Sequence, residues 1–137
     1  MFDRPDRLAL LGAAETALRD EVLPGLEGGA RYTALMVASA LAIARRELEA
    51  GNEPARVVLD AFAELYGQDN VHRAGGDSGE RVKALMADLA REIRDGEYDD
   101  DLLGPIHAVL QTLVVERLKR SNPRFLEARE YSQPSRC

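Results

Sequence analysis

The sequence predicts an all-α fold: a bundle of about five helices with a central, strongly apolar second helix. Apolar residues recur at three- and four-residue spacing through most of the chain, which is the pattern of amphipathic helices. Aromatic residues make up only 5% of the 137 residues, and tryptophan is absent. A core of Leu, Ala, Val and Ile favours helices over sheets. We expect one domain over residues 1–126 and a flexible tail over 127–137.

The first helix is expected to begin at Pro5, because proline is tolerated in a first helical turn and Asp3 precedes it as a cap. Pro24 and Gly25 are expected to end it. Its predicted inner face consists of Leu8, Leu11, Glu15, Leu18 and Val22.

The second and third helices are each followed by a glycine, the residue that most readily closes a helix in the left-handed conformation. The second is expected from Arg31 to about Ala50, and the third from Pro54 to Gly67. The polar, glycine-rich stretch 68–79 follows, and we expect it to be the longest loop.

The last two predicted helices are separated by the acidic connection EYDDD. The fourth helix begins near Asp77 or Ser78, either of which can cap it, and ends at Gly96. The fifth runs from about Leu103 to Asn122, since the residue before a proline avoids helical angles.

An almost uninterrupted apolar run, Ala34–Ala44, occupies the second helix and is broken only by Ser39. It spans about 16 Å at about 1.5 Å per residue, whereas a bilayer core needs about 20 apolar residues. Arg31 and Arg45 close it at its two ends. A membrane span is therefore not expected. A buried central helix accounts for the run, and a self-association face remains the alternative.

Three alanines at four-residue spacing form a ridge of small side chains on this helix: Ala34, Ala38 and Ala42. Such a ridge lets a neighbouring helix approach closely. We expect the ridge to be a helix-crossing point.

Composition and charge exclude several classes of function. The formal net charge of −6 argues against sequence-independent nucleic-acid binding and against anionic membranes. The lone cysteine, Cys137, cannot form an internal disulfide, and no signal peptide is visible, so we expect a cytoplasmic protein.

No catalytic or metal-binding motif occurs. The two histidines, His72 and His107, have no partners at metal-ligand spacing, and no phosphate-binding or nucleophile motif is present. We expect no enzyme activity, no metal and no cofactor.

Candidate binding residues are few. Arg31 and Tyr32 pair a guanidinium with an aromatic ring near one helix start, and Asn122 and Arg124 stand beside Phe125 at a helix end. With Arg45, these residues are the candidates for a ligand- or partner-binding role, because guanidinium groups bind phosphate and carboxylate. The structural alternative is that they cap helix ends.

Several segments also resemble a known family. RPDRLALLGAAETALRDEVLPGLEG, RYTALMVASALAIARREL, LAREIRDG and NPRF occur in an order that is similar to a bacterial family of small helical proteins classed as a domain of unknown function. The resemblance covers roughly residues 4–126. Members are often encoded beside acyl-CoA dehydrogenases and aminoglycoside-phosphotransferase-like kinases, which implies an accessory role in acyl-CoA catabolism. The resemblance implies no catalytic residue.

Two functional hypotheses follow. The first is a non-catalytic interaction or accessory protein that binds an acyl-CoA dehydrogenase or a kinase-like protein, or forms a homodimer. The alternative is a helical bundle that binds a small acyl or CoA-like anionic ligand, since bundle interiors can hold such molecules.

Overall fold

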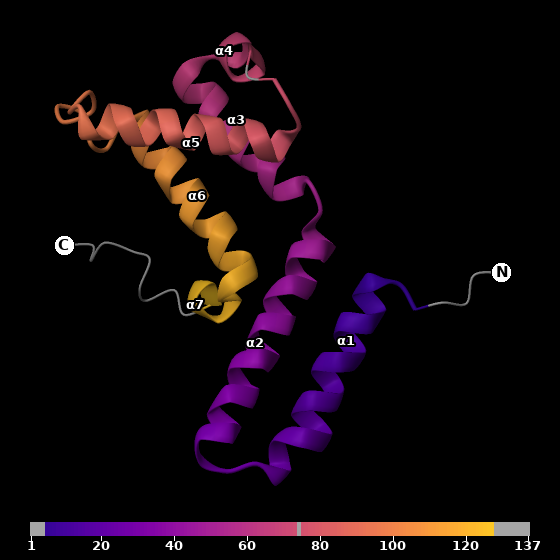
Figure 1. Cartoon of the computed structure of the whole chain (residues 1–137). Helices are drawn as coiled ribbons and strands as arrows, with labels where there is room; N and C mark the ends of the chain where they lie inside the picture. The colour runs from indigo at the N-terminus through magenta and orange to yellow at the C-terminus, as the bar shows by residue number, and fades with distance from the viewer. Residues whose placement is uncertain (1–4, 74, 128–137) are drawn as a thin grey trace. The chain divides into compact units, whose positions relative to one another are not determined.

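The structure is a computed structural model that describes residues 5–73 and 75–127, and within these ranges it is all-α (Figure 1). The described residues form seven α-helices and contain no strand. The expectation of an all-α helical fold is confirmed. The chain divides after Gly51 into two compact units, Met1–Gly51 and Asn52–Cys137.

Unit 1 begins with helix α1, Arg7–Ala17, which starts two residues later than the sequence predicted. The carboxylate of Asp6 caps it by accepting a hydrogen bond from the Ala9 amide at 2.8 Å. Asp3, the expected cap, lies outside the described residues. The cap satisfies one of the amides that the first helical turn leaves without a partner.

A π-helical turn, Leu18–Val22, continues α1 and is followed by a 3-10 turn, Leu23–Gly25. The Leu23 amide bonds to the Leu18 carbonyl, five residues back, and this adds one residue to the turn. Leu23 therefore falls on the inner face, at 8% exposure, whereas Val22 is 47% exposed. The prediction that Val22 belongs to that face was wrong, because simple helical spacing contains no inserted residue.

Helix α2, Gly28–Ala50, runs beside α1 and antiparallel to it (Figure 1). It begins three residues earlier than predicted. Gly51 closes it as expected, with a φ of 55° that glycine adopts without steric cost.

Unit 2 begins with α3, Glu53–Tyr66, and Gly67 follows with a φ of 88°. The expected loop over 68–79 is largely wrong, because Gln68–Arg73 forms a short helix, α4. Val71 explains the difference, since its side chain is buried in the core of the unit. Val71 is the buried apolar contact between this otherwise polar segment and the core.

Three further helices complete unit 2: α5, Ser78–Arg94; α6, Pro105–Ser121; and α7, Pro123–Glu127. Asp77 and Glu80 form a reciprocal capping box at the start of α5. As expected, a break at Asn122 ends α6. Of the expected tail over 127–137, only Glu127 is described, as the last residue of α7.

The hydrophobic core of unit 2 is built from four helices around Phe62, which is fully buried. The Phe62 ring stacks on the Tyr66 ring with centroids 5.8 Å apart. The buried members of this core are Val58, Leu59, Phe62, Ala63, Val71, Leu85, Leu89, Ile106 and Val109.

Candidate functional site

The buried residues of α2 are small, and Arg45 of the same helix bonds to Glu15 of α1. Ala34, Ala38 and Ala42 are the buried residues of that helix, and α1 packs on them. The predicted role of the alanine ridge as a crossing point is confirmed. Of the large apolar residues of α2, Leu41 and Ile43 are half-buried and the others are exposed.

We call the exposed large apolar residues of this helix the α2 surface. Tyr32 is 66% exposed and Met36 53% exposed, although the sequence had favoured a buried position for this helix. Tyr32, Leu35 and Met36 lie at three- and four-residue spacing and so share one side of the helix, and apolar side chains grouped in this way mark interaction sites more often than lone surface residues do. The members of the α2 surface are Tyr32, Leu35, Met36, Val37 and Leu48.

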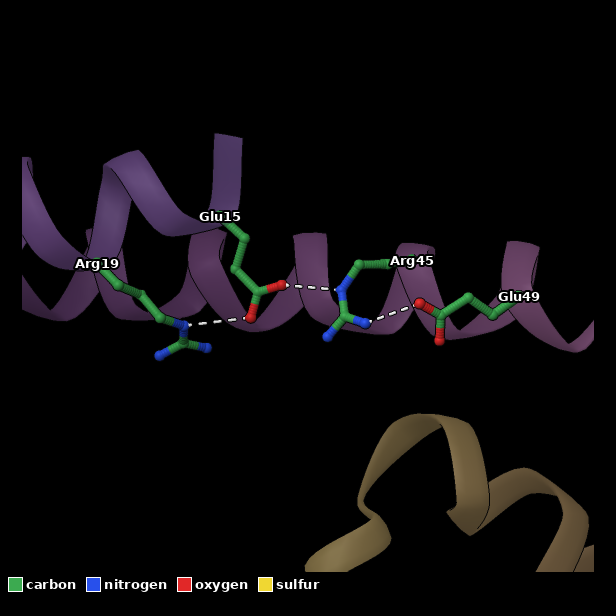
Figure 2. Close-up of polar contacts among 4 residues, drawn as sticks. All are labelled: Glu15, Arg19, Arg45 and Glu49. Atoms are coloured by element: carbon green, nitrogen blue, oxygen red, sulfur yellow. Dashed lines mark hydrogen bonds and ion pairs between the residues drawn. The ribbon is translucent and has the colours of Figure 1, made fainter. Parts of the chain in front are cut away.

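A chain of ion pairs joins the two helices of the hairpin (Figure 2). Glu15 of α1 bonds to Arg19 of the following π-helical turn at 3.3 Å and to Arg45 of α2 at 3.2 Å. Arg45 also bonds to Glu49 at 2.9 Å. Hydrogen bonds to Glu49 and then to Glu15 raise the pKa of Arg45 above its usual value. Arg45, a candidate ligand-binding residue, thus joins the two helices.

Arg31 and Tyr32 lie together near the start of α2 but have different environments. The Arg31 guanidinium donates a 2.9 Å hydrogen bond to the Leu23 carbonyl, which caps the end of the first helical segment. The phenol of Tyr32 points to solvent. Arg45 is about 21 Å further along the helix at about 1.5 Å per residue, so it forms no common site with them.

Asn122 and Arg124 belong to unit 2. The Asn122 amide bonds to the Leu118 carbonyl at 2.9 Å, and the Asn122 carbonyl accepts the Phe125 amide at 3.1 Å. The backbone of Asn122 thereby joins α6 to α7. Arg124 is exposed within α7.

Unit 2 also contains a groove of about 340 Å³ between α3 and α6. The carboxylate of Glu116 is buried at its edge and bonds to Lys119 at 2.7 Å, with Arg120 at 3.9 Å. Its charge is therefore balanced inside the same helix. The lining residues are Val57, Ala108, Gln111, Thr112, Val115 and Glu116.

One polar cluster was not found by sequence reasoning. The hydroxyls of Tyr66 and Tyr98 both donate to Oε2 of Glu92, at 2.5 Å and 2.7 Å. Burial and then the bond to Glu92 raise the pKa of each phenol. The cluster connects α3, α5 and the acidic turn before α6. The sequence feature that could have indicated this cluster was the presence of Tyr66 and Tyr98 in a chain with few aromatic residues.

Among the described residues, no group of three or more His, Cys, Asp or Glu side chains is arranged to hold a metal ion. None of the helices in the described ranges combines the length and the hydropathy that crossing a bilayer requires.

Comparison with known proteins identifies the family. The family model described as a domain of unknown function, DUF6285, matches residues 24–125. The chain belongs to this family, whose matched region covers residues of both compact units. The chain matches no curated protein and no solved structure.

Proposed function

We propose that this chain is a non-catalytic interaction protein that binds a partner enzyme through the α2 surface. The observation that carries the proposal is the exposure of Tyr32 and Met36 on a helix that buries only alanines. Covering a large apolar side chain contributes about 1.5–3 kcal/mol, so several of them supply much of a binding free energy. Aromatic residues and methionine are also enriched in protein interfaces.

The ion pairs between α1 and α2 support the same role. Glu15 and Arg45 fix the two helices of the hairpin relative to each other, so the surface is organised before a partner binds. A surface that is ordered in advance loses less entropy on association. Arg45 and Arg31 then act by holding the hairpin, and Tyr32 is the candidate residue that touches the partner directly.

For the partner class, we propose an acyl-CoA dehydrogenase or an aminoglycoside-phosphotransferase-like kinase, which is what the family resemblance implies. The accessory role in acyl-CoA catabolism and the cytoplasmic location belong to the same proposal. A single domain spanning residues 1–126 likewise remains a proposal.

Affinity capture from the native host tests this function. The tagged wild-type chain should retain a dehydrogenase or a kinase-like protein in stoichiometric amount. The variant Met36→Glu/Val37→Glu should lose it, whereas Ala13→Glu, which adds the same kind of charge to an exposed position on α1, should keep it. Equal retention by all three chains would contradict the proposal.

The alternative is that the groove beside Glu116 binds a small acyl or CoA-like ligand. Its apolar lining from Val57 and Val115 favours a short acyl chain. Lys119 and Arg120 already pair with Glu116, so they are poorly placed to bind an anionic head group, which is why we prefer the interaction role. A concentration-dependent rise in melting temperature with acyl-CoA would support the alternative, and no shift at saturating concentration would count against it.

A further inference from the structure

Helix α6 has a side that neither the core nor the groove uses. Ile106 and Val109 face the core, and Ala108 and Val115 line the groove. A third side carries four exposed residues at alternating three- and four-residue spacing, the pattern of a coiled-coil seam. We call these residues the α6 seam: His107, Leu110, Val114 and Arg117.

The middle of the α6 seam is apolar and open. Leu110 and Val114 are both exposed, Val114 at 57%. Just before the helix, Leu103 is exposed at 85%, although it lies in a hydrogen-bonded turn. Exposed large apolar residues grouped near one another are typical of interaction sites.

Charges at the two ends of α6 have opposite sign. Asp99, Asp100 and Asp101 are exposed in the turn before the helix. Arg117 lies in the second half of α6 and Arg124 in α7, and both are exposed. The surface is thus acidic before the helix, apolar in its middle and basic toward its end.

We propose that the α6 seam binds the α6 seam of a second copy of this chain in antiparallel orientation. A two-fold axis between Leu110 and Val114 sets Leu110 of each copy against Val114 of the other. The same axis brings the acidic turn of each copy toward the basic end of the other. Such an interface is self-complementary, as two-fold symmetry requires.

The orientation follows from the charges. A parallel pairing would set Asp99 and Asp100 of the two copies against each other, and Arg117 against Arg117. Like charges facing each other across an interface disfavour association and suppress the wrong arrangement. The antiparallel pairing sets Arg117 opposite His107 of the other copy, which removes the repulsion between the arginines. It also brings the acidic turn toward Arg124, which replaces the repulsion between the aspartates with an attraction. Because the acidic and basic ends of this surface complement each other in antiparallel orientation, the partner that fits it is a second copy of this chain.

Sedimentation velocity over a wide range of protein concentration tests the interface. We expect a reversible monomer–dimer equilibrium for the wild-type chain. Leu110→Glu should weaken it about tenfold or more, equivalent to about 1.4 kcal/mol. Gln111→Glu is the matched control: it adds the same charge at the next, exposed residue, on the groove side, and should weaken the dimer far less. Helical circular dichroism confirms that both variants fold.

A charge-swap experiment tests the orientation. Asp99→Lys/Asp100→Lys and Arg117→Glu/Arg124→Glu should each dimerise poorly alone, because both ends of the interface then carry one sign. A mixture of the two variants should dimerise as well as the wild type. A wild-type chain that is monomeric at every concentration, or a mixture that fails to associate, would overturn the proposal.

The inference does not depend on the α2 surface. Met36→Glu/Val37→Glu should dimerise like the wild type even where it loses the partner enzyme. A dimer that this variant abolishes and Leu110→Glu leaves intact would refute the α6 interface.

Discussion

The Arg45 guanidinium of α2 lies 3.2 Å from the Glu15 carboxylate of α1. This ion pair joins the same two helices that pack together at the alanine ridge. Glu15 was the only charged member of the face predicted for the first helix. Its side chain is 16% exposed, so the ion pair is partly shielded from water. A charge within an apolar stripe was thus the sign of a specific contact with a neighbouring helix.

The alanine ridge should not tolerate a larger side chain. Ala38 is fully buried at the crossing of α1 and α2, so Ala38→Leu should lower the free energy of unfolding by about 1–3 kcal/mol. Urea denaturation followed by circular dichroism measures the change. Ala40→Leu is the control, because Ala40 is exposed on the same helix and should accept leucine with little loss. Equal stability of the two variants would show that α1 does not approach the ridge closely.

The Glu15–Arg45 pair should stabilise the hairpin modestly and in a salt-dependent way. Glu15→Gln keeps the shape of the side chain but removes its charge, and the melting temperature should fall slightly at low ionic strength. Added salt should narrow the difference from the wild type in part, since the Arg45 side chain is 32% exposed and ions can screen the pair from that side. A difference that salt leaves unchanged would mean that the contribution of Glu15 is not electrostatic.

The Tyr66–Glu92–Tyr98 cluster predicts a loss of stability at alkaline pH. An unfolded tyrosine titrates near pH 10, whereas both phenols have raised pKa values in the folded chain. Above about pH 10 the folded state binds more protons than the unfolded state, so the stability should fall as pH rises. Below that pH the contribution of the phenols is fully present.

The free energy of unfolding, measured at neutral and at alkaline pH, tests whether stability falls as the pH rises. The variant Tyr66→Phe/Tyr98→Phe should be less stable than the wild type at neutral pH and should lose less stability on the alkaline side. Parallel pH profiles for the two chains would contradict the assignment.

Val71 should anchor helix α4 to unit 2. Its side chain is almost completely buried, so Val71→Ala should lower the free energy of unfolding by roughly 2 kcal/mol. This lies between the usual cost of removing one buried methyl group and that of truncating a buried leucine to alanine. Amide hydrogen exchange should then increase over Gln68–Arg73 more than over α5. Unchanged protection of this segment would show that α4 forms without its apolar anchor.

The sequence correctly predicts those features of the fold that depend only on residues close together in the chain. The alanine ridge, the glycine stops at Gly51 and Gly67, and the break at Asn122 all follow from a few neighbouring residues. The exposure of Tyr32 and Met36 does not, because an apolar run fits a buried helix as well as a docking surface.

The remaining errors have particular physical causes. The π turn inserts one residue and so places Leu23 on the inner face. Regular three- and four-residue spacing does not predict such an insertion. Helix α4 depends on the distant packing of Val71. The bonds from Tyr66 and Tyr98 to Glu92 join residues far apart in the chain, so only the folded structure brings them together.

The central claim, that the α2 surface binds a partner enzyme, is tested most directly by site-specific photo-crosslinking. A photoreactive amino acid at Met36 should join the chain to one partner protein in the native host, and the same group at Ala13 of α1 should not. A single crosslinked dehydrogenase or kinase-like protein at Met36 alone is the predicted result. Crosslinks that are absent at Met36, or equally abundant at both positions, would contradict the account.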